Sequence, residues 1–392
     1  MNLELHILQS FSPSNLNRDD TGSPKDCEFG GVRRARISSQ CLKRSIRLAF
    51  EDQGLLEEES LAVRTRKIGA EVARCLTAAG KAETEAKTVA DTALAAVGLG
   101  AGKSGDSQYL LFVPKSALAR FSETCLRNWE VLRGPGPSAG PAPAPKALPA
   151  KAPAKKVAEL PKEIIKELEC LFEVGKAADV ALFGRMIADR PKDNVVAASQ
   201  VAHALSTHKA DLEFDFYTAV DDLQTDGETG AGMMGTVEYN AACFYRYANL
   251  DLTQLSRNLG GDEALMQETV AAFLQASIAA IPSGKQNSMA AQNPPSLVLA
   301  VIRKSGFWSL TNAFLKPVRA TGTADFVTAS IDALGDYWER LTTMYGEPEN
   351  AWVGVSTLHP EAVRGFATAK DVLAISDLVT GVSARVASAA KG

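Results

Sequence analysis

The chain contains little of what metal centres and disulfide frameworks require. Its 392 residues include four histidines and six cysteines. No two cysteines form a C-x-x-C pair, and no histidine spacing suits a zinc site. Scattered cysteines are typical of a reducing compartment, so we expect a cytoplasmic protein. The sequence predicts no metal site and no cofactor.

Long hydrophobic runs are also missing. The N-terminus lacks the basic and apolar regions of a signal peptide. The longest apolar run near the C-terminus, LVLAVI at 297–302, is too short to cross a membrane. We therefore expect a soluble protein, and its length suggests two to three domains. A net charge of −4 means that any nucleic-acid surface must be local.

One stretch departs from this weakly acidic balance. KDCEFGGVRRARISSQCLKRSIR, residues 25–47, holds seven basic side chains against two acidic ones. The Gly30–Gly31 pair would let a ligand approach the backbone closely. These features favour phosphate binding, and the alternative is a solvated basic surface. The basic residues are Lys25, Arg33, Arg34, Arg36, Lys43, Arg44 and Arg47.

The second half of this stretch predicts an amphipathic helix. Ser38 and Ser39 are good N-cap residues, and free backbone N–H groups should then lie beside the basic side chains. Lys43, Arg44 and Arg47 would lie opposite the buried side. The apolar side consists of Leu42, Ile46, Ala49 and Phe50.

Strands and helices are unevenly interspersed, which predicts an α+β fold. A strand at 2–9, a polar loop and the basic helix are compatible with a ferredoxin-like or RRM-like sheet. The aromatic RNP1 signature is absent, so base stacking on the sheet is not predicted. Further strands are expected in DLEFDFYTAVDDLQ, TVEYNAACFYRYANLDL and LVLAVI, and helices at 262–280, 323–345 and 368–390.

The middle of the chain is helical and rich in alanine from about 55 to 132. GLGAGKS at 98–104 resembles a P-loop, but Val97 stands where the first glycine is required and the preceding segment looks helical. We reject that interpretation. Residues 134–156 contain seven prolines and no acid, which predicts a mobile linker that splits one helical subdomain.

Two other features have competing interpretations. The glycine-rich segment 222–235 ends near Met233 and Met234, which suggests a loop that contacts a partner. His203 is expected to be a paired structural histidine. The loop around Asp19 and Asp20 could use its own side chains to hold a turn, and these adjacent acids form no metal site by sequence alone.

Four motifs together resemble one known family. SPSNLNRDD, FGGVRRARISSQCLKRSIR, FYTAVDDLQ and FYRYANLDL occur here in the order found in the CasC family. That family is the repeating backbone subunit of the type I-E CRISPR Cascade complex. The resemblance is strong over 1–50 and 180–290, thinner over 290–392, and weak between 60 and 180.

The resemblance implies an architecture and a set of partners. An RRM-like palm would comprise 1–58 and 181–392, with helical fingers at 59–180 and a thumb hairpin at 217–245. About six copies would stack along one crRNA and displace every sixth base. The guide would then pair with target DNA in segments. Other partners would be the large, small, 5′-handle-binding and 3′-hairpin-processing Cascade subunits.

The resemblance also assigns site residues without any catalytic role. Those expected to hold the guide backbone are Arg18, Lys25, Ser38, Gln40, Lys43, Arg44 and Arg47. Met186, Tyr217 and Thr218 would wedge the displaced base. One alternative is an RNA-cleaving subunit of type III-like kind that uses Asp19 or Asp20. Another is a stand-alone binder of single strands.

Overall fold

The computed structural model divides the chain into two compact units. The sheet unit comprises 1–56, 197–257 and 261–392, and the helical unit comprises 57–196 and 258–260. The structure describes residues 1–99, 110–134, 160–173, 175, 177–187, 190–219, 233–322, 324–346, 350–361, 366 and 372–390. Nearly all of the proline-rich linker at 134–156, most of the 222–235 segment and the GAGKS part of the P-loop-like motif lie outside the described residues.

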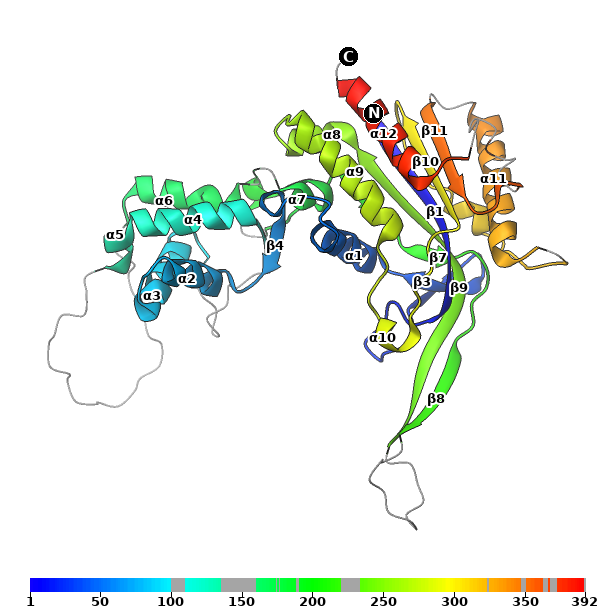
Figure 1. The fold of residues 1–392 in the computed structure, drawn as a ribbon, viewed down its shortest axis with the longest axis horizontal. Helices are drawn as coiled ribbons and strands as arrows, with labels where there is room; N and C mark the ends of the chain where they lie inside the picture. Colours follow the sequence, from blue (N-terminus) through cyan, green and yellow to red (C-terminus); the bar gives the residue numbers. More distant parts are fainter. Residues whose placement is uncertain are drawn as a thin grey trace, which may run out of the picture. The chain divides into compact units, whose positions relative to one another are not determined.

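The sheet unit is built on one large sheet whose strand pairings are antiparallel (Figure 1). Its order is β11-β10-β1-β9-β7-β3-β2, and β6 and β8 also pair with β9. The strands are β1 Asn2–Ser14, β2 Asp26–Phe29, β3 Val32–Ile37, β6 Ser199–Val201, β7 Ala204–Ser206, β8 Glu213–Ala219, β9 Met233–Asp251, β10 Leu297–Arg303 and β11 Asn350–Thr357. The α+β prediction is confirmed.

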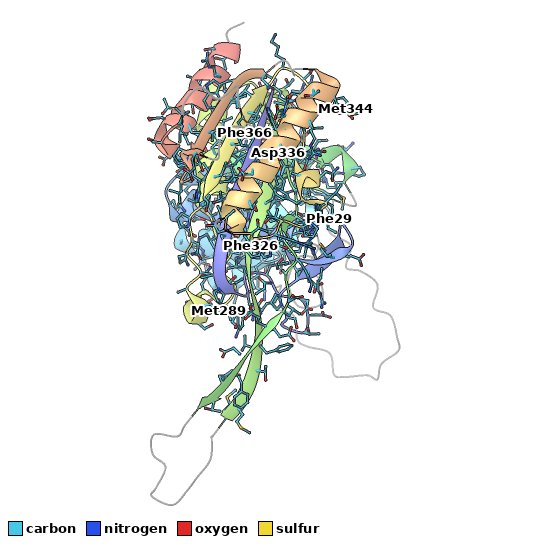
Figure 2. All side chains as sticks on the ribbon, turned by 90° about the vertical axis from the view of Figure 1, so that its right-hand side faces the viewer. Phe29, Met289, Phe326, Asp336, Met344 and Phe366 are labelled. Carbon is cyan, nitrogen blue, oxygen red and sulfur yellow. The ribbon has the colours of Figure 1, made fainter. Side chains whose placement is uncertain are left out.

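Helices cover both faces of this sheet. Helices α1, α9 and α12 lie on one face, whereas α11 lies along the other, as Figure 1 and the view onto α11 in Figure 2 show. Ile331, Leu334 and Trp338 of α11 join the core that includes Leu8 of β1. The helices of this unit are α1 Ser39–Asp52, α8 Leu252–Asn258, α9 Glu263–Ala279, α10 Gln286–Met289, α11 Phe326–Tyr345 and α12 Ile375–Ala390.

Because both faces are covered, β1 does not alternate between buried and exposed residues. It is also longer than the strand predicted at 2–9. Glu4 and His6, on the face under α11, are fully buried. Glu4 forms a short ion pair with Arg303 and accepts a 3.1 Å hydrogen bond from the Tyr247 hydroxyl. Burial raises the pKa of Glu4, and the neighbouring Arg303 charge opposes that rise.

The order of elements around the centre of the sheet is regular. Helix α1 comes after β1 and the β2–β3 hairpin, and α9 lies between β9 and β10 in the chain. These strands lie side by side as β10-β1-β9-β7. Asp262 and Asp325 cap α9 and α11 by accepting from Leu265 N and Thr328 N. The helices predicted at 262–280 and 323–345 are therefore present, while the last helix starts at Ile375, later than expected.

The helical unit packs its helices around a core of its own. Val72, Ala90, Phe121 and Leu168 are fully buried there. Its helices are α2 Ile68–Ala78, α3 Glu83–Ala96, α4 Lys115–Arg127, α5 Trp129–Arg133, α6 Lys162–Leu168 and α7 Ala178–Phe183, and its strands are β4 Ala62–Thr65 and β5 Leu111–Pro114. A helix, α3, precedes the P-loop-like motif, which is consistent with rejecting a P-loop. Among the described residues, no helix is both long and apolar enough to span a membrane.

Candidate nucleic-acid interface

Helix α1 has the two-sided character that its sequence predicts. Ser38 caps it, since its hydroxyl accepts from Cys41 N at 3.3 Å. Its apolar side is buried, and Lys43 is half-buried while Arg44 is exposed. Gln40 is exposed in the first turn and Arg47 is half-buried one turn after Lys43. Tight packing of the apolar side fixes the direction in which the basic side chains leave the helix.

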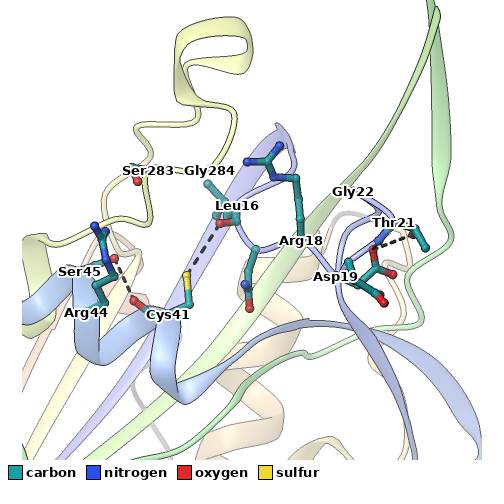
Figure 3. A pocket seen from close by; sticks show the side chains of 12 residues that line it. Leu16, Arg18, Asp19, Thr21, Gly22, Cys41, Arg44, Ser45, Ser283 and Gly284 are labelled. Atoms are coloured by element: carbon teal, nitrogen blue, oxygen red, sulfur yellow. Dashed lines mark hydrogen bonds between the residues drawn. The ribbon is translucent and has the colours of Figure 1, made fainter. Parts of the chain in front are cut away.

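Arg18 and Arg44 both line one polar pocket of about 560 Å³, whose lining also includes Asp19 and Asp20 (Figure 3). Arg18 comes from the loop after β1, and Arg44 comes from α1. Ser283 and Gly284, far away in the sequence, line another side of the pocket. The structure thus brings together two of the residues predicted to hold a guide backbone.

Four cations on α1 and near the Arg18 loop form no ion pair in the described part of the chain, although Asp19 and Asp20 line the pocket beside Arg18 and Arg44. The ion pairs formed by Lys and Arg in the sheet unit use other residues: Arg33–Asp26, Lys209–Asp211 and Arg303–Glu4. Partial burial lowers the pKa of Lys43, with no opposing carboxylate. A bound anion would favour the charged form of that amine. The cations concerned are Arg18, Lys25, Lys43 and Arg44, which we call the open cations.

The start of α1 is less available than expected. Ser38 N donates to Asn17 Oδ1 at 2.8 Å, and Ser39 N donates to His203 Nδ1 at 3.2 Å. Together with the Ser38 cap of Cys41 N, these bonds occupy backbone donors that were predicted to face a ligand. That prediction is wrong for these three N–H groups. The side chains of Asn17, His203 and Ser38 accept their hydrogen bonds in place of a ligand. The prediction of a paired structural His203 is confirmed.

Arg34 does not belong to the ligand-facing basic surface. Its side chain is fully buried and donates to the carbonyl oxygens of Ser206 at 3.0 Å and Phe314 at 2.7 Å. Arg33 is paired with Asp26 at 2.5 Å. The inclusion of Arg34 among phosphate-binding candidates is therefore wrong, because β3 lies inside the sheet unit and this side chain points into it.

The glycine pair also has a structural role. Gly30 and Gly31 have φ values of 63° and 75° and connect the closing pair Phe29–Val32 of a tight hairpin. A Cβ on Gly30 would lie 1.8 Å from the Leu315 carbonyl oxygen. The close approach that Gly30 allows is to the protein's own backbone, not to a ligand as predicted, and a Cβ on Gly31 would meet no described atom within 4 Å.

Asp19 is used by its own loop. Its Oδ1 accepts from Thr21 N at 2.9 Å, the Thr21 hydroxyl at 2.8 Å and Ser23 N at 3.0 Å. The hydrogen bond from Thr21 is the main cause that lowers the pKa of Asp19. This is the self-held turn named as one alternative. Asp20 is exposed, and the described residues contain no group of three His, Cys, Asp or Glu side chains placed to hold a metal.

Strands β8 and β9 form a hairpin whose described part exposes large apolar side chains. Tyr217 pairs with Gly235, and Thr218 pairs with Met234. A Cβ on Gly235 would meet the Tyr217 ring at 2.5 Å, so this glycine makes room for the ring. Met233 and Met234 belong to β9, not to a loop as predicted. The exposed side chains include Phe214, Phe216, Tyr217, Met233 and Met234.

Met186 belongs to the helical unit and is 83% exposed. The residues on either side are held firmly. Arg185 exchanges backbone hydrogen bonds with Val195 at 3.0 and 2.8 Å, and Ile187 N donates to Asn194 Oδ1 at 2.6 Å. The chain therefore presents one exposed thioether between two anchored neighbours.

Sequence reasoning missed the segment around α10. Ser283 and Gly284 line the pocket, and Lys285 follows them in a left-handed backbone conformation with φ 52°. The only local signal was the Pro-Ser-Gly-Lys sequence, which marks a turn without indicating what the turn contacts.

Comparison with known proteins identifies the family. The model of the family described as CT1975-like protein matches residues 3–381. A solved chain from a "CRISPR RNA-guided surveillance complex, pre-nicking" is 28% identical, with TM-score 0.79 over 98% of this chain and all of that one. A chain from a "CRISPR RNA-guided surveillance complex" is 25% identical, with TM-score 0.71 and the same coverages. No curated protein matches. The chain belongs to the CT1975-like protein family.

Proposed function

We propose that this chain is a non-catalytic, cytoplasmic backbone subunit of a CRISPR surveillance complex that holds the phosphates of a crRNA. One observation carries the proposal: on α1 and near the Arg18 loop, the open cations form no ion pair with any described residue. Phosphate contacts of this kind position a nucleic acid without selecting its sequence. That suits a complex in which base pairing supplies the specificity.

The arrangement of the sheet supports an RRM-like palm. If β2, β3, the helical unit and the short or peripheral elements β6, β8, α8 and α10 are left out, the chain runs β1, α1, β7, β9, α9 and β10. The strands of this set lie in the order β10-β1-β9-β7. A ferredoxin-like or RRM-like fold has this alternation of strands and helices. The candidate interface lies on α1 and the β1 loop rather than on exposed sheet aromatics, in keeping with the missing RNP1 signature.

The β8–β9 hairpin is proposed as the thumb. The stretches of β8 and β9 that pair with each other, 213–219 and 233–239, carry the acids Glu213, Asp215 and Glu238 and no basic side chain, so we do not assign phosphate contact to them. Exposed rings and thioethers suit contact with bases or with a protein surface. In this proposal Tyr217 and Thr218 of the sheet unit contact a displaced base, and Met186 of the helical unit is a further base-contacting residue. About six copies would act along one crRNA of type I-E kind, which pairs with target DNA.

RNA of graded length tests the proposal. Mixed with single-stranded RNA of 12 to 36 nucleotides, the full chain should add one copy for about every six nucleotides, measured by native mass spectrometry. Affinity should fall with salt and should not depend on RNA sequence. A single copy bound whatever the RNA length would favour the stand-alone binder. Cleavage of complementary RNA in the presence of Mg²⁺ or Mn²⁺ would favour the RNA-cleaving alternative.

A further inference from the structure

The segment around α10 is strained at both ends. Lys285 has φ 52° and Ala290 has φ 48°, and they are the residues other than glycine with positive φ in the described part of the chain. The left-handed region is unfavourable for side chains with a Cβ. Such residues persist where surrounding structure fixes them, and they are enriched at ligand-binding sites. We call residues 282–290 the α10 loop.

Hydrogen bonds hold the α10 loop in this shape. The Gln286 side chain donates to the carbonyl oxygens of Pro282 and Ala291, both at 3.1 Å. Met289 N donates to Lys285 O at 3.0 Å. Just beyond the loop, Asn293 accepts from Ser12 N and the Ser12 hydroxyl at 3.2 Å, so the following chain is fixed to β1.

The loop also lies directly against the segment that carries Arg18. A Cβ on Gly284 would be 2.4 Å from the Leu16 carbonyl oxygen and 2.8 Å from that of Asn15. Only glycine permits this approach without a shift of backbone. Ser283 and Gly284 consequently form a wall of the pocket that Arg18 and Arg44 also line.

We propose that the α10 loop is a third phosphate-contacting element, in which Lys285 joins Arg18 and Arg44 on the same stretch of RNA backbone. Lys285 directly follows the two lining residues and is half-buried. It forms no ion pair within the described part of the chain, where the sheet unit's Lys and Arg pairs use other cations. Lys285 keeps an unfavourable backbone conformation and has no acidic partner among the described residues. A ligand that its ammonium group contacts would explain both features. This inference rests on the proposed function.

Two substitutions separate the charge of Lys285 from the strain of the loop. Lys285→Gln keeps the Cβ and removes the charge, so the magnitude of the slope of log K against log salt for single-stranded RNA should fall by about 0.7 per subunit. Its Tm should stay within about 1 °C of the original protein. Ala290→Gly is the matched control, because it relieves strain at the other end of the loop and changes no charge. It should leave the slope unchanged and hold or raise Tm by about 1–2 °C.

Arg44→Ala distinguishes failure of this inference from failure of the proposed function. If Lys285→Gln keeps the original salt slope while Arg44→Ala reduces it, the role of Lys285 is overturned and the proposed function stands. An original protein whose RNA binding does not respond to salt would overturn both. A slope lost equally in Lys285→Gln and Ala290→Gly would show that loop shape, not the lysine charge, matters, and would also overturn the inference.

Discussion

Three arginines of the helical unit are held in ion pairs, whereas the open cations of the sheet unit are not. In the helical unit, Arg120 lies 2.8 Å from Glu173, Arg127 lies 3.4 Å from Glu167, and Arg74 lies 2.5 Å from Glu71. Around α1 of the sheet unit, the open cations have no such partner among the described residues. Exposed ion pairs add little to stability. Their main consequence here is to neutralise Arg74, Arg120 and Arg127, whereas the open cations keep their charge without an ion pair among the described residues.

This contrast explains how an acidic protein can offer a binding surface for RNA. The net charge of −4 describes the whole chain, whereas a phosphate responds to the nearby potential. A Lys or Arg side chain that neutralises an RNA phosphate releases the counterion held there, and a side chain already in an ion pair is less available for that contact. The absence of acidic partners is therefore a better guide to the interface than the number of basic residues.

The largest effect expected is from a charge placed on the buried side of α1. Ile46 is 1% exposed, so Ile46→Asp puts an unpaired carboxylate into the core and should cost more than about 4 kcal/mol. The sheet unit should unfold, as measured by circular dichroism and limited proteolysis. Gln40→Asp adds the same charge at an exposed position of the same helix and should leave the melting curve nearly unchanged. If Ile46→Asp melts at the same temperature as the original protein, this side of α1 is not part of the core.

Arg34 should behave as a structural residue despite lying in the basic stretch. Arg34→Met removes the donors to the Ser206 and Phe314 carbonyl oxygens and leaves them unsatisfied. The cost should be about 2 kcal/mol, or roughly 4–8 °C in Tm. The salt slope of RNA binding should not change, because the side chain is fully buried. A reduced slope with an unchanged Tm would place Arg34 in the interface after all.

Arg34 also shows what the sequence could and could not predict. Hydrophobic spacing predicted α1 and α9 closely, because the apolar periodicity of a helix is local. The destination of each arginine in RRAR depends on strand partners such as β7, about 170 residues away, and no local pattern encodes that pairing. The same applies to His203 at the start of α1 and to the α10 loop beside Arg18. Both the start of α1 and the pocket beside Arg18 are completed by residues far away in the sequence.

Replacing three cations by alanine in one unit or in the other tests directly whether paired and unpaired cations differ in RNA binding. Changing Arg18, Lys43 and Arg44 together to alanine should lower the magnitude of the RNA salt slope by about 2 per subunit, since each phosphate contact contributes about 0.7. Stability should change little, because these side chains form no ion pairs in the described structure.

The matched control is the triple alanine variant of Arg74, Arg120 and Arg127, which removes the same charge from the helical unit. It should leave the RNA slope unchanged, because carboxylates already neutralise those side chains. Anisotropy titrations over a series of KCl concentrations measure both variants. Equal losses of slope would mean that net charge, and not the open cations, governs binding.

The smallest effects are expected at the two aspartates of the Arg18 loop. Asp19→Ala removes an acceptor of three hydrogen bonds and should loosen the loop, which would weaken RNA binding by about two- to threefold through the position of Arg18. Asp20 is exposed and makes no such turn, so Asp20→Ala should leave RNA affinity unchanged. Neither the variants nor the original protein should cleave an RNA complementary to the guide in the presence of Mn²⁺. A cleavage ladder from the original protein that disappears in Asp20→Ala would instead make this loop a catalytic site. The open cations would then serve to hold a substrate as well as a guide.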